Sequence, residues 1–215
     1  MKNNHTNRYS VPEDENFEPD SGEAVLKNFL GIKSKDTMEA IEEQELGRTE
    51  LALLEIFNEN RRFSIEDLCN IHELWLGDIY PFAGKYRTVN MSKNDFAFAP
   101  AMRIADLMAK FDQKFLNQYT PCHYTNIDDL TYALGVVHIE FILIHPFREG
   151  NGRTARLLAD LMAMQAKKPP INYSAIDQTQ NPDGFSQYIL SIHAGLDENY
   201  TPIQKIFRIL LEQST

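Results

Sequence analysis

The sequence is poor in cysteine and in positive charge, and each shortage excludes a class of function. Only Cys69 and Cys122 occur in 215 residues, so there is neither a disulfide framework nor a zinc-binding spacing, and reduced thiols in a cytoplasmic protein are expected. Lys and Arg total 21 against 31 Asp and Glu, a net charge of −10. Nucleic-acid surfaces are basic, so we expect no nucleic-acid partner and, on the same grounds, no membrane-surface role.

Long apolar runs are also missing. No stretch approaches the roughly 20 residues that span a bilayer. Residues 1–21 are polar and acidic and lack the apolar core of a secretory signal. They predict a flexible N-terminal arm, and a cytoplasmic location is expected, although delivery into another cell by a secretion machine stays open.

Apolar spacing along the remaining chain predicts a mostly α protein with one β-hairpin. A short helix is expected at 23–32, stopped by Gly31, and the residues 22–59 are expected to form N-terminal helices. An aromatic and β-branched segment predicts hairpin strands near 86–90 and 95–98. Further helices are predicted at 37–58, 64–79, 101–118, 125–144, 152–168, 182–195 and 202–213.

The stretch HPFREGNGRTAR, residues 145–156, follows the apolar run 141–144. Gly150 and Gly152 flank Asn151 between two predicted helices. Glycine permits positive φ and close approach of a ligand, and the amides that begin a helix attract phosphate. This turn therefore indicates a phosphate-binding loop.

Arg153 and Arg156 lie three residues apart and share one face of the first helical turn. Two cations at a helix N-terminus oppose the helix dipole. They indicate that an anion normally lies between them, and guanidinium groups match phosphate geometry. Taken alone, an arginine pair is more often surface charge.

Glu149 and His145 add reactive groups to the same stretch. One carboxylate beside phosphates is the usual way to hold Mg²⁺, and a neutral imidazole can accept a proton from a hydroxyl. Together these residues predict phosphoryl or nucleotidyl transfer to a hydroxyl. Each has an ordinary alternative, since a histidine at a helix end is usually structural and GNG is a common turn.

The stretch resembles the signature of the Fic family, His-x-Phe-x-Asp/Glu-Gly-Asn-Gly-Arg-x-x-Arg. The matching positions are His145, Phe147, Glu149, Gly150, Asn151, Gly152, Arg153 and Arg156. The segments LWLGDIYPFAGKYRTVNMSKNDFAFAP and HIEFILIHPF are similar to the family's approach to its flap and to its histidine. The resemblance implies a Fic (Fido) domain at 60–213, folded as a helical bundle with a β-hairpin flap.

The resemblance also implies an activity, protein AMPylation, in which AMP passes from ATP to a Ser, Thr or Tyr hydroxyl of a target protein. By this resemblance His145 is the catalytic base, Phe147 is a buried anchor of the loop, and Glu149 binds Mg²⁺ between phosphates. The hairpin would clamp a segment of the target by adding a strand.

Nucleotide contacts are implied in the same way for the rest of the signature. Asn151 and the amides of Gly150 and Gly152 would hold the α- and β-phosphates of ATP. Arg153 would hold the β/γ region, and Arg156 the γ-phosphate. A related branch that resembles the Doc toxin has Lys in place of Gly152 and phosphorylates its target, so Gly152 favours AMP transfer. Transfer of UMP or phosphate, and a catalytically silent binding module, stay open as alternatives.

Many relatives carry an inhibitory helix with the pattern Ser/Thr-x-x-x-Glu-Gly/Asn, whose Glu pairs with the last arginine of the signature. No Ser or Thr of this chain has Glu four residues later. The resemblance therefore suggests either an unrestrained enzyme or a separate small antitoxin that supplies the Glu; filamentation-type toxins share the signature. An acidic helix at 37–46 that folds back without the pattern stays open. His72 and His138 lie on apolar stripes and are expected in the core or behind the site.

Overall fold

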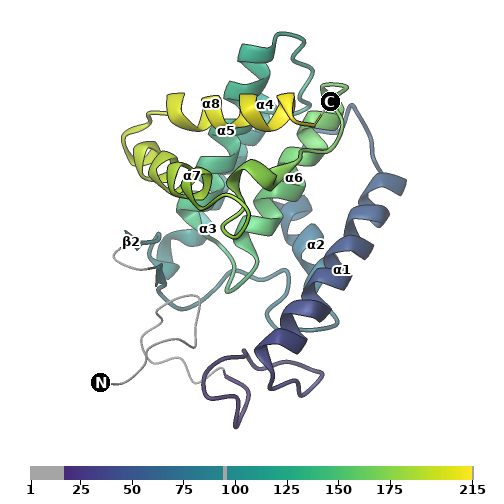
Figure 1. Ribbon diagram of the computed structural model, residues 1–215, viewed down its shortest axis with the longest axis vertical. Coiled ribbons are helices and arrows are strands. Elements are labelled where there is room, and N and C mark those ends of the chain that lie inside the picture. Colours follow the sequence, from purple (N-terminus) through teal and green to yellow (C-terminus); the bar gives the residue numbers. More distant parts are fainter. Residues whose placement is uncertain (1–16, 94–95, 215) are drawn as a thin grey trace. The chain divides into compact units, whose positions relative to one another are not determined.

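Residues 17–93 and 96–214 are described by a computed structural model (Figure 1). Helices dominate these residues, as the sequence predicted, and they contain one small antiparallel sheet. The chain divides into two units. The first comprises the described residues up to Ile56, Glu66–Ala105 and Pro146–Gly150; the second comprises Phe57–Ile65, Asp106–His145 and the described residues from Asn151. The predicted arm at 1–21 lies largely outside the described residues.

In the first unit, helices α1 (Lys35–Glu55) and α2 (Ile65–Leu76) are joined by buried polar contacts. The Ser34 side chain accepts the Thr37 N–H and begins α1, as is usual for a serine at this position. Glu42 is buried on α1. Its carbonyl accepts the indole N–H of Trp75 at 2.9 Å, and its carboxylate accepts the hydroxyl of Tyr80 at 2.6 Å. These bonds fix α1 against α2 and the turn that follows it.

The predicted helix at 23–32 is wrong. These residues form turns, and Leu26 makes an isolated antiparallel bridge with Phe17. The side chain of Asn28 explains the difference. Its amide donates to the carbonyls of Leu26 and Ile32, and its oxygen accepts the N–H groups of Leu30 and Ile32, at 2.9–3.1 Å. An asparagine that takes up the backbone groups around it competes with the helical bonds.

The segment 86–99, called the flap below, contains strands β1 (Ser92–Lys93) and β2 (Phe96–Ala97). Ser92 pairs with Ala97, and Lys93 with Phe96. The predicted second strand near 95–98 overlaps β2. The prediction of a strand at 86–90 is wrong, because Arg87 intervenes: its guanidinium donates to the carbonyls of Val89 and Ala99, both at 2.6 Å. At the base of the flap, the two sides are therefore joined by the Arg87 side chain and not by backbone hydrogen bonds between paired strands.

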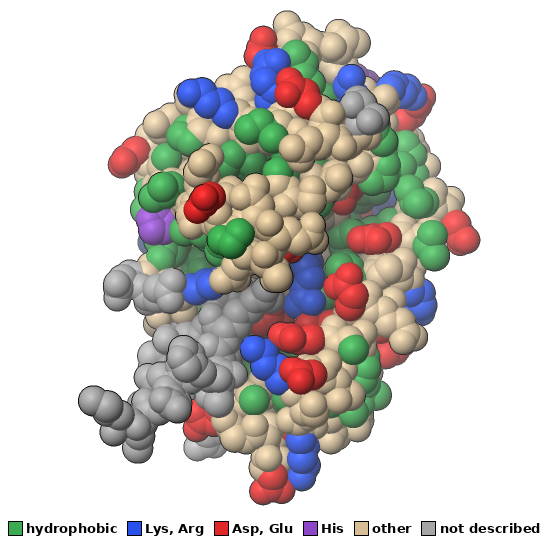
Figure 2. All heavy atoms as spheres, in the orientation of Figure 1, with side chains coloured by type: hydrophobic (Ala, Val, Ile, Leu, Met, Phe, Trp, Pro, Cys, Tyr) green, Lys and Arg blue, Asp and Glu red, His purple; other side chains and the backbone are tan. Residues whose placement is uncertain are grey.

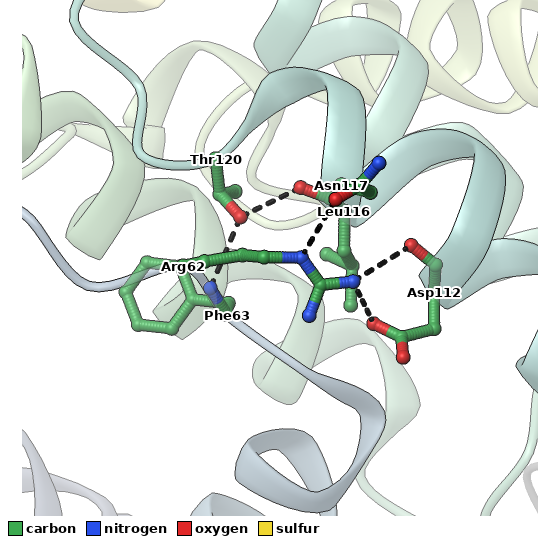
Figure 3. A network of polar contacts seen from close by, with 6 residues as sticks. All are labelled: Arg62, Phe63, Asp112, Leu116, Asn117 and Thr120. Atoms are coloured by element: carbon green, nitrogen blue, oxygen red, sulfur yellow. Dashed lines mark hydrogen bonds and ion pairs between the residues drawn. The ribbon is translucent and has the colours of Figure 1, made fainter.

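The second unit contains most of the predicted helix at 101–118, but its winding changes along the way. A 3₁₀ turn (Ala101–Arg103) leads into α3 (Ile104–Phe111), a π-helical segment η2 (Asp112–Leu116) and α4 (Asn117–Tyr119). Arg62 and Phe63 form hydrogen bonds to the π-helical segment η2 and to the residues that follow it (Figure 3). Arg62 donates to the carbonyl and carboxylate of Asp112, and Thr120 accepts the N–H of Phe63.

Helix α5 (Ile127–Ile144) is the buried helix of the second unit. Asn126 caps it, and its side chain accepts the N–H of Asp128 at 2.7 Å. The helices α6 (Asn151–Gln165), α7 (Pro182–Ala194) and α8 (Thr201–Glu212) all contact α5. Four apolar side chains of α6 are buried: Leu157, Leu158, Leu161 and Met162.

The surface is mixed in character. On the face shown in Figure 2, acidic and basic side chains are interspersed with apolar ones. Within residues 17–93 and 96–214, no helix is both long and apolar enough to cross a membrane.

Candidate active site

His145 ends α5 in an uncommon backbone conformation. The following proline disfavours continued helix at His145, and its φ of 53° lies in the left-handed region, where histidine is tolerated better than most residues. Its backbone N–H still donates to Phe141, and the ring Nδ1 lies 3.2 Å from the carbonyl oxygen of Ile142. A carbonyl only accepts, so Nδ1 carries the proton and Nε2 the lone pair of the neutral ring.

The next five residues, 146–150, belong to the first unit and rest on α2. Phe147 is fully buried and stacks on His72 with ring centroids 3.9 Å apart. Gly150 has a φ of +80°, and a Cβ there would lie 2.6 Å from Cζ3 of Trp75. Both the conformation and the space therefore require glycine at this position. The prediction of Phe147 as a buried anchor agrees with this packing.

Glu149 is 9% exposed, and its carboxylate accepts the N–H of Gly150 at 2.8 Å. Among the described residues there is no group of three or more His, Cys, Asp or Glu side chains able to hold a metal. A cation at Glu149 would thus have at most one further ligand of these residue types within the described part of the chain. Mg²⁺ that arrives with a nucleotide needs no more, because phosphates and water supply its other ligands.

Helix α6 begins in the second unit at Asn151, which is fully buried. Its first turn contains no acid, and Arg153 lies there half-buried. Of the two glycines in the signature, only Gly150 has a positive φ. Gly152 has no positive φ, and a Cβ there would meet no atom within 4 Å. Neither the backbone conformation nor the surroundings of Gly152 therefore require glycine.

Arg156 lies beside an aromatic side chain that the sequence did not identify. The Arg156 guanidinium is 5.0 Å from the ring centroid of Tyr173, and the Tyr173 hydroxyl donates to the Arg156 carbonyl at 3.1 Å. The same hydroxyl contacts Asp160 at 3.2 Å. Burial, with Asp160 nearby, raises the pKa of Tyr173 well above its ordinary value, so the phenol stays a donor. Residue 173 lies in a 3₁₀ turn (Tyr173–Ile176), outside any periodic pattern.

His138 lies deeper on α5, as expected for a residue behind the site. Its Nε2 is 2.9 Å from the hydroxyl of Tyr188. Burial, with a smaller effect of Arg156, lowers the pKa of His138 from 6.5 to about 3. His138 is therefore neutral under ordinary conditions and contributes packing and a hydrogen bond rather than charge.

The predicted site residues fall into two groups. Phe147, Glu149 and Gly150 lie in the first unit. The second unit holds His145, Asn151, Gly152, Arg153 and Arg156. The groups are continuous along the chain, with His145 and Asn151 on either side of residues 146–150.

A sequence model of the Fic/DOC family matches residues 62–163, which include every residue of both groups. Residues 62–163 of this chain belong to the Fic/DOC family. The resemblance noted on the signature is thereby confirmed.

Curated relatives of this chain carry the name protein adenylyltransferase. VbhT of Bartonella schoenbuchensis is 30% identical over 168 residues, which cover 74% of this chain and 32% of that protein. The fic-1 protein of Caenorhabditis elegans is 34% identical over 115 residues, or 53% of this chain and 22% of that protein. The chain therefore spans about a third or less of the length of these relatives.

Solved Fic structures share the fold of this chain. The N-terminal Fic domain of Bep8 from Bartonella sp. 1-1C superposes with a TM-score of 0.73 at 18% identity, covering 87% of this chain and 91% of that one. BepC from Bartonella tribocorum, solved with bound AMPPNP, gives a TM-score of 0.66 at 18% identity over 86% and 91%. The expected mostly α Fic fold with a hairpin flap is confirmed.

Proposed function

We propose that this protein is an ATP-dependent protein adenylyltransferase that transfers AMP to a Ser, Thr or Tyr hydroxyl of a target protein. The observation that carries the proposal is the contact of His145 Nδ1 with the Ile142 carbonyl, 3.2 Å away. It leaves the Nε2 lone pair to act as a base, at the start of a complete Fic signature. The activity named for the curated relatives supports the same reaction.

In this reaction the target oxygen forms a bond to the α-phosphorus of ATP, and the bond from that phosphorus to the β-phosphate bridging oxygen breaks. The hydroxyl proton goes to Nε2 of His145, and pyrophosphate leaves. The αL conformation of His145, φ 53°, turns the chain out of α5 and holds the imidazole at the helix end.

The phosphates would bind at the start of α6. The Gly152 position is open to a close ligand, and the first-turn amides with Arg153 provide donors and positive charge. Arg156 would hold the terminal phosphate, with Tyr173 against its guanidinium. Asn151 and Gly150 would complete the contacts to the inner phosphates.

Glu149 would hold Mg²⁺ together with the nucleotide phosphates. When bound, the cation neutralises phosphate charge that increases as the leaving group departs. The chain's own part is to present one buried carboxylate whose Oε1 is held by the Gly150 N–H at 2.8 Å. Removal of Mg²⁺ by a chelator is expected to stop transfer.

The flap is proposed to bind the target protein. The flap contains the antiparallel strands β1 and β2, of two residues each. A target segment that added a strand here would bind through main-chain groups, which demands little of its sequence. The residue modified would then be selected by its distance from the paired strand and not by a long consensus.

Regulation by a separate small antitoxin is part of the proposal. No Ser or Thr in this chain precedes a Glu by four residues, so the chain lacks the inhibitory pattern of many Fic relatives. Single Glu→Gly replacements along α1 are expected to leave self-labelling at the wild-type level. A large activation by one of them, measured with labelled ATP, would contradict the proposal.

A cytoplasmic location is proposed from the two thiols. Cys122 is buried, and that burial raises its pKa to about 12, which keeps the thiol protonated and unreactive. Cys69 is half-buried and its pKa is also raised by burial. Both fit a reducing compartment.

Transfer of another group is the second candidate, since the signature is shared by Fic enzymes that move UMP or phosphate. Gly152 favours AMP over phosphate transfer. A catalytically silent module would tolerate the loss of His145 or Glu149, and both are present.

The first experiment is expression of the protein in host cells, followed by mass spectrometry of peptides from the host proteins. The proposal predicts an AMP adduct on Ser, Thr or Tyr that disappears with His145→Asn. A UMP or phosphate adduct that depends on His145 would replace AMP transfer with the second candidate. No adduct of any kind, with ATP bound, would favour the silent module.

A further inference from the structure

His72 on α2 makes two directional contacts through its two ring nitrogens. Nδ1 accepts the backbone N–H of Gly84 at 2.9 Å, and Nε2 lies 3.0 Å from the carbonyl oxygen of Glu149. A backbone N–H only donates and a carbonyl only accepts. The proton must therefore be on Nε2, and the ring is neutral. This side chain is fully buried.

One peptide group links this ring to the carboxylate of Glu149. The carbonyl that His72 binds and the N–H of Gly150 belong to the same peptide, which is planar. That N–H donates to Glu149 Oε1 at 2.8 Å. By fixing the plane of the peptide, His72 also fixes the donor that orients the carboxylate.

The face and edge of the imidazole also support the loop. Phe147 stacks on it at 3.9 Å with an interplanar angle of 21°. Gly150 passes so close that a Cβ there would be 3.4 Å from Nε2. Three residues of the segment 146–150 therefore rest on this one ring.

The other nitrogen connects this support to the flap. Gly84 precedes Arg87 by three residues, and Arg87 closes the flap base through Val89 and Ala99. The Arg87 backbone N–H donates to the Pro146 carbonyl at 2.8 Å. Two contacts thus join the entry to the flap and the loop of Glu149: the ring of His72, and the hydrogen bond from Arg87 to Pro146.

We propose that His72 is a positioning residue that orients Glu149 for the nucleotide-bound cation and couples the flap entry to it. The proposal rests on the proposed function, because it assigns the cation to Glu149. It gives a buried histidine of α2 a role that simple core packing would not require, since core packing needs neither nitrogen in a defined protonation state.

Two amide variants separate the two nitrogens. In His72→Gln, the amide nitrogen lies near the place of Nε2 and can still donate to Glu149. In His72→Asn, the amide oxygen lies near the place of Nδ1 and can still accept from Gly84, but nothing reaches Glu149. Leu68→Ala is the matched control, because Leu68 is fully buried on the same helix and makes no polar contact through its side chain.

The first measurement is the Mg²⁺ concentration that half-saturates ATP-dependent labelling, with kcat determined alongside. Loss of a group that orients a metal ligand typically costs 10- to 100-fold in metal affinity, so His72→Asn should raise this concentration about 10-fold. The half-saturating Mg²⁺ concentration of His72→Gln should stay near the wild-type value. Leu68→Ala should lower thermal stability and leave the half-saturating Mg²⁺ concentration unchanged. Equal values for His72→Asn and His72→Gln would overturn the proposal.

A second measurement does not depend on catalysis. In the wild type, nitrogen-15 NMR should show His72 as the Nε2-protonated tautomer, and amide exchange at Gly150 should be faster in His72→Asn than in His72→Gln. The Nδ1-protonated form, or equal Gly150 exchange in both variants, would overturn the positioning role. If these results hold while no labelling occurs in wild type, the proposed function fails and the coupling of His72 to the loop stands.

Discussion

The side chain of Tyr173 contacts Arg156 in two ways, through its ring and through its hydroxyl. The ring centroid is 5.0 Å from the guanidinium carbon, and the hydroxyl donates to the Arg156 carbonyl at 3.1 Å. An arginine side chain has many rotamers. The aromatic face therefore limits the positions of the one arginine that the Fic signature assigns to the terminal phosphate.

Replacing Tyr173 by leucine is expected to weaken ATP binding. A cation–π contact contributes about 0.5–2 kcal/mol, which corresponds to roughly 2- to 30-fold in affinity. Tyr173→Phe retains the ring and should retain most of the affinity while losing the bonds of the hydroxyl. Titration calorimetry with ATP and Mg²⁺ compares the two, and equal losses of affinity would show that the ring does not position Arg156.

Replacing His145 by asparagine should slow transfer steeply and preserve the fold. Asparagine tolerates the left-handed backbone conformation that His145 adopts, so α5 should end as before. General-base catalysis contributes about 10²- to 10⁴-fold, and labelling should fall by that factor at unchanged ATP affinity. Wild-type labelling by this variant would remove His145 from the mechanism.

Alanine at the two glycines of the signature should act in opposite ways. Gly150→Ala should destabilise the fold, because φ is +80° and the Cβ would meet Trp75 at 2.6 Å. Gly152→Ala should leave stability unchanged or raise it by up to about 1 kcal/mol, since alanine favours helix over glycine.

The same Gly152→Ala change should weaken nucleotide binding, because the methyl group occupies the space left for the phosphates. Thermal unfolding with and without ATP and Mg²⁺ measures both effects. A variant that is stable and still gains the wild-type thermal shift from ATP would contradict the placement of the phosphates at α6.

Stability should fall in mild acid because of His138. Its pKa is lowered from 6.5 to about 3 by burial, so below pH 6.5 the unfolded chain binds a proton that the folded chain does not. The contribution is fully present above pH 6.5 and is lost as pH falls towards 3, by about 1.4 kcal/mol per pH unit. Urea unfolding at pH 7 and pH 5 measures it, and His138→Gln should have a shallower dependence.

The sequence predicted the α5–loop–α6 region well because its signals are local. Asn126 caps α5, Pro146 follows its end, and apolar residues repeat along α6. The separate roles of the two glycines were not predictable, since the clash at Gly150 comes from Trp75, far away in sequence.

The errors have a common physical cause, which is a polar side chain that takes backbone groups away from regular structure. Asn28 does this at 23–32, and Arg87 does it at the predicted strand 86–90. Such bonds cannot be predicted from the composition of a segment or from the spacing of its apolar residues. Tyr173 was missed for a related reason, because nothing in its local sequence relates it to Arg156.

The central claim is that His145 promotes the transfer of AMP from ATP to protein. The most direct test incubates the purified protein and a target-containing extract with ATP that is labelled at either the α- or the γ-phosphate. The account predicts that protein becomes labelled from α-labelled ATP only, that Mg²⁺ is required, and that His145→Asn gives no label. Label from γ-labelled ATP that is lost in His145→Asn, or α-label that stays at the wild-type level in His145→Asn, would contradict it.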